Sequence, residues 1–317
     1  MNRREFLSIA SVFAAGPVSF SYARAATPAR PIEALVVVEF AGGNDGLNTV
    51  IPIADAQYRA LRPTLAISRD HALAIDERTA LHPSLRALMP AWTAREWAIV
   101  QGVGYAQPNR SHYRAQQIWT TASDAHEYRR DTWLARVGPS RADFARPASS
   151  PFEARSFAVS CDAATRLIAA NRARNGVTVI RLALDGFDTH THQAKRHASL
   201  LLQFADGIAR LRAALIASGD WAGTLVMTRS EFGRSAREND VRGTEHGAAA
   251  PQFVLGGAVR GGLYGEPPLL GRLDEEGGVT ASVDFRRLCA TVLQACGNAD
   301  HAAILGRAFE PMPLIHT

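Results

Sequence analysis

The sequence predicts an α/β fold, a three-layer sandwich with a mostly parallel central sheet. Apolar runs of strand length recur along the chain, and each is followed by a segment whose apolar residues recur at helical spacing. Continuous apolar runs are typical of strands that are covered on both faces, as the strands of parallel sheets are. Alternating strands and helices therefore indicate a sheet between two helical layers.

Five runs are expected to form buried parallel strands: ALVVVEF (34–40), EWAIVQGV (96–103), VTVIRLAL (177–184), GTLVMTR (223–229) and QFVLGG (252–257). The helical segments between them are AQYRALRP (56–63), PSLRALMPAWTA (83–94), RAQQIWTTA (114–122), AATRLIAANRAR (163–174) and the long segment 195–219. The loop-like segment 138–153 is interpreted as an insertion rather than a linker, which predicts a single domain over 26–317.

Residues 1–25 have the features of a twin-arginine export signal: the pair Arg3 and Arg4, an apolar stretch, and the small-residue cleavage site Ala23-Arg24-Ala25. The apolar stretch is broken by glycine and proline and is shorter than the roughly 20 residues of a membrane span. We therefore expect a cleaved periplasmic or secreted protein that meets the twin-arginine translocase only during export and keeps no membrane span.

The net charge is +5, of which the signal contributes +2, so that +3 remains for the mature chain. Basic residues show no long run, and so small a charge is not the footprint of a nucleic-acid-binding protein. The charges are expected to lie scattered on a solvated surface.

Four polar clusters directly or closely follow predicted strands, where ligands bind in such folds. They are GGNDG (42–46), NRSHYR (109–114), GFDTH (186–190) and SEFGR (230–234). A fifth, GTEHG (243–247), precedes the last predicted strand and offers an acid beside a histidine.

LDGFDTHTHQ (184–193) contains an acid and two histidines. If a helix has begun, Asp188 and His192 share a face because they are four residues apart, and we select this pair over His190, which is expected to lie beside the site. Such a pair fits a divalent ion, but taken alone it fits a hydrogen-bonded loop equally well.

Ser111 stands just before a helical run, where it is either a plain N-cap or a hydroxyl nucleophile at a helix N-terminus. In the second case Arg110 or Arg114 would hold an anionic substrate. GGNDG taken alone favours a tight turn that caps a helix.

Taken together and in order, these motifs resemble the DUF1501 family of exported proteins, which is similar to the alkaline phosphatase superfamily. The matching stretches cover most of residues 34–290 and are VVVEFAGGNDGLNTVIP, YRALRPTLAI, LHPSLRAL, AIVQGVGY with NRSHYRAQQIW, GFDTHTHQ, VMTRSEFGR, EN with GTEHG, FVLGGAVRGGLYG and VDFRRL. The resemblance implies an alkaline phosphatase-like fold and hydrolysis of phosphate or sulfate esters by a serine nucleophile at a centre of one or two divalent ions, with zinc expected.

The resemblance also implies roles for single residues. One metal site would have Asp188, His192 and His246 as ligands, and a second would have Asp45 and Glu231 beside the nucleophile Ser111. Residues expected around these ligands are Asn44, His112, His190, Arg234 and Glu245.

Phe232 departs from the family pattern, because many superfamily members have a histidine there. A phenyl ring binds no metal, so the second ion is expected to be absent, to bind more weakly, or to be of a kind that prefers oxygen ligands. Glu245 stands where family members more typically have aspartate. The alternative function is a non-catalytic periplasmic protein that keeps one metal for binding or assembly.

Overall fold

A computed structural model describes residues 31–137, 157–172, 176–298 and 300–316. The predicted export signal (1–25) and the whole of the predicted insertion (138–153) lie outside these residues. Among the described residues, no helix combines the length and the apolar character that a membrane crossing requires.

All five predicted strands are present, within two residues of their expected bounds. They are β1 (Ala34–Ala41), β5 (Trp97–Gly104), β6 (Thr178–Asp185), β7 (Thr224–Arg229) and β10 (Ala250–Leu255). With β11 (Gly262–Tyr264) and β12 (Val283–Asp284), they form a seven-stranded sheet in the order β11-β5-β10-β7-β1-β6, in which β12 also pairs with β5. The prediction of an α/β fold with a mostly parallel central sheet is confirmed.

The predicted direction of one strand is wrong. β1 pairs in parallel with both β6 and β7, whereas β10 pairs antiparallel with both β5 and β7. The apolar run of β10 shows only that both its faces are buried, which is compatible with either direction at the centre of a sheet. The short hairpin of β8 (Arg234–Glu238) and β9 (Thr244–His246) lies between β7 and β10 and reverses the chain.

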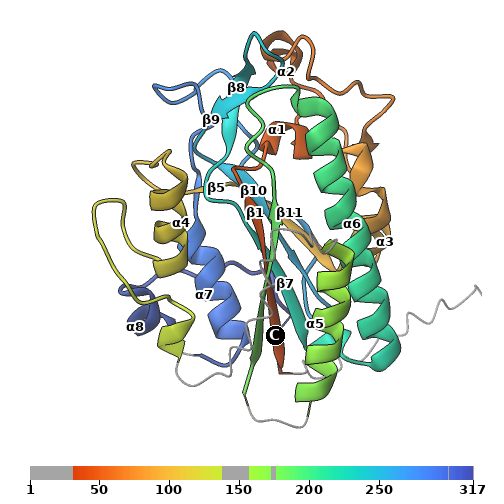
Figure 1. Cartoon of the computed structure of the whole chain (residues 1–317), viewed down its shortest axis with the longest axis vertical. Helices are drawn as coiled ribbons and strands as arrows, with labels where there is room; N and C mark the ends of the chain where they lie inside the picture. The colour runs from red at the N-terminus through yellow and green to blue at the C-terminus, as the bar shows by residue number, and fades with distance from the viewer. Residues whose placement is uncertain (1–30, 138–156, 173–175, 299, 317) are drawn as a thin grey trace, which may run out of the picture.

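Helices cover both faces of the sheet, which gives the three predicted layers (Figure 1). Side chains of β1 alternate between the layers, because successive residues of a strand point to opposite faces. Val36, Val38 and Phe40 pack in the core formed with α5 (Phe157–Asn171) and α6 (Gln193–Ser218). Leu35 and Val37 pack in the opposite core, formed with α4 (His112–Thr121) and α7 (Phe285–Ala295).

The remaining elements are short. They are α1 (Gly46–Thr49), α2 (Ala56–Leu61), α3 (Met89–Thr93), α8 (His301–Leu305), three 3-10 turns (Pro83–Leu88, Ala135–Val137, Trp221–Gly223), and the small sheet of β2 (Val50–Ile51), β3 (Leu73–Ala74) and β4 (Ala80–Leu81). The segment 83–94, predicted as one helix, is a 3-10 turn followed by α3.

The carboxyl ends of β1, β6 and β7 meet at one edge of the sheet, because these strands are parallel and adjacent. The antiparallel β10 begins at this same edge, so the hairpin before it is delivered there as well (Figure 1). Four of the five polar clusters therefore lie together above β1, β6 and β7, and α4 brings the fifth.

Candidate metal centre

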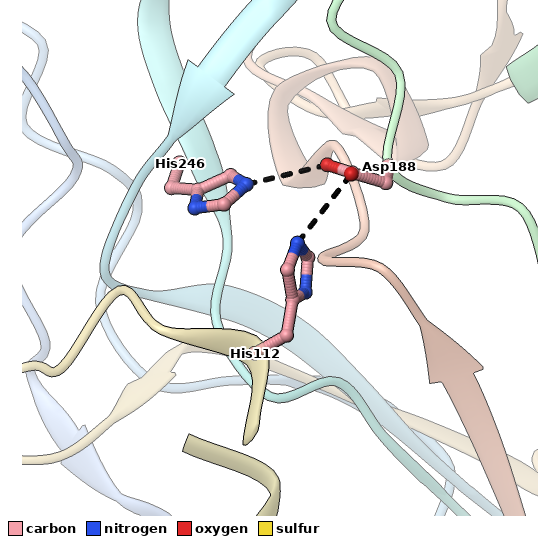
Figure 2. Close-up of side chains that lie close together, drawn as sticks. All are labelled: His112, Asp188 and His246. Carbon is pink, nitrogen blue, oxygen red and sulfur yellow. Dashed lines mark hydrogen bonds and ion pairs between the residues drawn. The ribbon is translucent and has the colours of Figure 1, made fainter. Parts of the chain in front are cut away.

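Three side chains from distant parts of the chain converge on this edge. They are His112 at the first residue of α4, Asp188 in the loop after β6, and His246 at the end of β9, and Figure 2 shows both imidazole rings pointing at the Asp188 carboxylate. His246 Nε2 lies 3.2 Å from Asp188 Oδ1, and His112 Nε2 lies 3.5 Å from Asp188 Oδ2. One ligand atom from each residue lies within 4.8 Å of the others, which is close enough to share one metal ion.

In both His112 and His246, the ring nitrogen that faces away from Asp188, Nδ1, lies within hydrogen-bond distance of an acceptor. His112 Nδ1 lies 3.0 Å from Glu231 Oε1, and His246 Nδ1 lies 2.8 Å from the carbonyl oxygen of Arg110. A carbonyl or an ionised carboxylate only accepts, so each Nδ1 donates its proton outward and each Nε2 turns a lone pair toward Asp188. Metal-binding histidines are oriented in this way.

Glu231 is buried and rigidly held. Its Oε1 also accepts from the Gly42 backbone N–H at 2.8 Å and from Gln116 Nε2 at 3.3 Å, and its carbonyl oxygen accepts from Trp119 Nε1. Its second oxygen, Oε2, is buried without a hydrogen-bond partner among the described residues. This unsatisfied oxygen beside His112 fits a cationic neighbour better than an anionic one.

Arg234 supports the cluster from the buried side. It is fully buried, donates to Asp188 Oδ1 at 2.5 Å and also donates to the carbonyl oxygens of Gly43 and Thr244. Partial burial opposes ionisation of Asp188, but the hydrogen bond and the charge of Arg234 outweigh it, and the pKa of Asp188 falls to about 2. Burial lowers the pKa of His246. Both groups are therefore in their metal-binding protonation states at neutral pH.

Two glycines allow the loops to approach this closely. A Cβ on Gly42, where φ is +117°, would lie 2.3 Å from the Asp188 backbone nitrogen, and a Cβ on Gly243 would lie 2.0 Å from the His190 carbonyl oxygen. Neither position has room for a side chain. The glycines thus fix the backbone at both ends of the segment 188–190.

The choice of His192 over His190 is wrong in its geometry. α6 begins at Gln193, so Asp188 and His192 are not on one helical face; His192 is the left-handed N-cap residue (φ 48°), and its side chain is exposed. His190 Nε2 instead lies 3.0 Å from Asp188 Oδ1. The seven residues between β6 and α6, 186–192, are not helical, and in an extended backbone residues two apart share a face.

The placement of Asp45 in a second metal site is also wrong. Its carboxylate is fully buried in an ion pair with Arg62, at 2.6 Å, and accepts from Gln193 Nε2 at 2.5 Å. Burial opposes ionisation of Asp45, but the charge and hydrogen bond of Arg62 lower its pKa. The neighbouring Asn44 accepts from His197 and Thr49 in the same buried network. A guanidinium thus neutralises the acid that the second ion was expected to hold.

Phe232 packs directly against two of the candidate metal ligands, His112 and His246. Its ring centroid lies 4.9 Å from that of His112 and 4.5 Å from that of His246, and the side chain is buried. The phenyl ring therefore occupies the space beside both histidines and positions them by packing.

The two arginines expected to grip an anion have other partners. Arg110 donates to Asp274 and Glu276 at 2.6 and 2.5 Å. Arg114 is buried, donates to Gln117 and to backbone carbonyls, and stacks on Tyr128. The Nη1 and Nη2 atoms of each guanidinium are therefore engaged by acceptors of this chain, while Arg114 Nε is buried without a hydrogen-bond partner among the described residues.

Ser111 is exposed at the N-cap of α4 and makes no side-chain capping bond. Because it directly precedes His112, its Cα lies about 3.8 Å from that of the candidate ligand. The exposed Glu245, predicted to lie near the site, has its Oε2 2.8 Å from His190 Nδ1.

The family model described as "Protein of unknown function (DUF1501)" matches residues 120–315, which is more than half of the chain. The chain belongs to this family. The matched range of the DUF1501 model includes Asp188 and His246 and leaves out Ser111 and His112. No curated protein matches the sequence.

Among solved structures, the matches have low sequence identity to this chain. The C-terminal periplasmic domain of EcEptC from Escherichia coli, in complex with zinc, is 13% identical, with a TM-score of 0.47 and 84% of this chain and 83% of that chain covered. A protein in the alkaline phosphatase superfamily from Vibrio parahaemolyticus is 10% identical (TM-score 0.47; 88% and 69% covered). The phosphonate monoester hydrolase SpPMH from Silicibacter pomeroyi is 10% identical (TM-score 0.42; 88% and 78% covered).

The structure of this DUF1501 chain also contains a buried polar network that the sequence did not indicate. Arg62, Gln193 and His197 form the buried network around Asp45, and burial lowers the pKa of His197 to about 3. An arginine in a helical pattern and a polar residue at a helix start are typical of exposed positions, so nothing local distinguished them. For Gln193, the one signal was its place at the end of a run of six polar residues, 188–193, at a strand-to-helix junction.

Proposed function

We propose that this DUF1501 protein is an exported, metal-dependent hydrolase of phosphate or sulfate esters that uses Ser111 as its nucleophile. One observation carries the proposal: two histidines with lone pairs turned inward meet an ionised aspartate, next to an exposed serine at a helix N-terminus. Asp188 is 46% exposed, so a ligand from solvent has access to it.

A divalent ion, with zinc expected from the nitrogen and oxygen donors, would polarise the ester and lower the pKa of a nearby hydroxyl or water. His112, Asp188 and His246 would hold it. Ser111 would present its hydroxyl at the edge of the site, and the first N–H groups of α4, which lack intrahelical acceptors, would face the ester's anionic oxygens. Arg110 and Arg114 have no part in this proposal, since both guanidiniums bind acceptors of this chain.

Metal analysis and ester hydrolysis test the proposal together. The purified protein should contain one divalent ion per chain and hydrolyse an aryl phosphate or an aryl sulfate, and chelation should abolish the turnover. Ser111→Ala should abolish turnover while leaving metal content unchanged, and Ser199→Ala, at an exposed serine of α6, serves as the matched control. No bound metal together with no turnover would sink the proposal.

A second candidate is a non-catalytic periplasmic protein that keeps one metal for binding or assembly. The pairing of Asp45 with Arg62 and the ring of Phe232 favour it, since both occupy positions that a second ion was expected to use. The two candidates separate on Ser111→Ala, because a binding protein has no turnover to lose.

Export by the twin-arginine route is part of the proposal and rests on the sequence of residues 1–25. Replacing both Arg3 and Arg4 with lysine should leave the unprocessed chain in the cytoplasm. Processed protein outside the cytoplasm in that variant would refute this route.

A further inference from the structure

We infer that His190 is a fourth ligand of the metal centre, and that it closes the three-residue set of His112, Asp188 and His246. The inference rests on the metal binding in the proposed function but not on the proposed hydrolysis. It concerns a residue that lies two positions from Asp188 and two from the exposed His192.

The donor atoms of His190, Asp188 and His246 have the spacing of three ligands of one ion. His190 Nε2 lies 3.0 Å from Asp188 Oδ1 and 3.0 Å from His246 Nε2, and His246 Nε2 lies 3.2 Å from the same oxygen. Zinc binds histidine nitrogen and carboxylate oxygen at about 2.0–2.2 Å, so two ligands of a tetrahedral ion lie about 3.3–3.5 Å apart. The observed separations are within a few tenths of an ångström of that edge.

The hydrogen bonds of the Nδ1 atoms of His190 and His246 also support a shared cation. His190 Nδ1 lies 2.8 Å from Glu245 Oε2, and His246 Nδ1 lies 2.8 Å from the Arg110 carbonyl oxygen, so each Nδ1 is the donor of its pair. In the neutral rings the two Nε2 atoms then face each other with lone pairs only, at 3.0 Å. Two lone pairs and a carboxylate oxygen at this distance repel unless a cation lies among them.

Arg234 supplies only part of the positive charge that these three atoms require. Its Nη1 lies 3.4 Å from His190 Nε2, at the limit of a hydrogen bond, while its Nη2 is directed to Asp188. It approaches from the buried side, and His112 faces the other carboxylate oxygen, Oδ2. Arg234 therefore orients Asp188 from the buried side. The Nε2 lone pairs of His112, His190 and His246 face the Asp188 carboxylate from its other side.

Four protein ligands change what the site can do. A tetrahedral ion with four protein ligands has no open position, which is the arrangement of structural sites. Hydrolysis at this centre then requires that substrate either adds as a fifth ligand or displaces His190, which is 37% exposed and tied to Glu245 on the surface.

Cobalt substitution with single cysteine variants tests the inference directly. A thiolate bound to Co²⁺ gives a charge-transfer band in the near ultraviolet that a thiolate outside the coordination sphere does not give. His190→Cys loaded with Co²⁺ should show this band, and the matched control His192→Cys should not. The wild type sets the background from its three native cysteines, Cys161, Cys289 and Cys296.

Affinity provides the second measurement. His190→Ala should weaken zinc binding by about 100-fold or more, beyond the 10–100-fold that loss of an outer-shell partner costs, whereas His192→Ala should change it less than about twofold. A wild type that binds metal while His190→Cys gives no band overturns the inference and leaves the hydrolase proposal standing. If His190→Cys gives the band but the wild type hydrolyses no ester, the inference holds and the hydrolase proposal fails.

Discussion

The buried ion pair of Asp45 and Arg62 leads to a prediction that separates a structural acid from a metal ligand. In Asp45→Asn the Arg62 guanidinium loses its counterion at 2.6 Å but keeps the carbonyl oxygens of Ser235 and Ala236 at 2.9 Å. Breaking a buried pair by removal of one partner costs about 3–5 kcal/mol. Because Arg62 keeps these acceptors, we expect the lower end, a loss of about 3 kcal/mol in the free energy of unfolding.

Urea denaturation of the metal-free protein measures this loss, and metal analysis of the same samples should show unchanged content. Asp55→Asn is the matched control: Asp55 caps α2 by accepting from the Gln57 N–H, and since asparagine caps as well as aspartate, its effect should stay within about 0.5 kcal/mol. Arg62→Met combined with Asp45→Asn should be less destabilising than the sum of the single variants. Reduced metal content in Asp45→Asn with full stability of the metal-free protein would refute the assignment.

Three further predictions follow from other parts of the structure. His197 stays neutral in the fold because burial lowers its pKa from 6.5 to about 3, so the unfolded chain takes up a proton that the fold does not. The stability contributed by His197 is therefore full above pH 6.5 and falls by about 1.4 kcal/mol per pH unit between pH 6.5 and about 3; His197→Gln should reduce the slope measured in urea titrations, and an unchanged slope would contradict the cause. Gly243→Ala should weaken zinc binding by about 10-fold or more, since its Cβ would displace the His190 carbonyl by more than 1 Å and with it a metal-binding segment; wild-type affinity in a competition titration would show that the loop adapts. Phe232→His should not raise metal content above one ion per chain, because Asp45 stays paired; a second tightly bound ion by elemental analysis would show that the phenyl ring alone excludes it.

The sheet was predictable because it depends on burial, which the sequence records directly. β1 and β7 are covered on both faces, and the consecutive apolar residues 34–38 and 225–227 indicate this. The direction of β10 was not predictable, since an antiparallel central strand has the same apolar run. What reverses the chain is the hairpin of β8 and β9, whose strands are too short and polar to stand out.

The candidate site was predictable as a set of loops but not in its pairings. Asp188 and His246 were selected and the structure brings their side chains together, because chain ends at one sheet edge must meet. The choice between His190 and His192 depended on where α6 begins, and helix starts are uncertain by a residue or two. Arg62 escaped notice because its partner, Asp45, is 17 residues away and the pair is buried only in the complete fold.

The antiparallel β10 also ties the metal centre to the pairing of the sheet. His246 stands four residues before β10 begins at Ala250. A slip of β10 by one residue would move this segment by about 3.4 Å and turn its side chains to the opposite faces, whereas a zinc ion accepts ligand distances within only about 0.2 Å. Under the proposed metal binding, a chain whose central strand has slipped would be unable to assemble the candidate centre, so a bound ion would identify a correctly paired sheet.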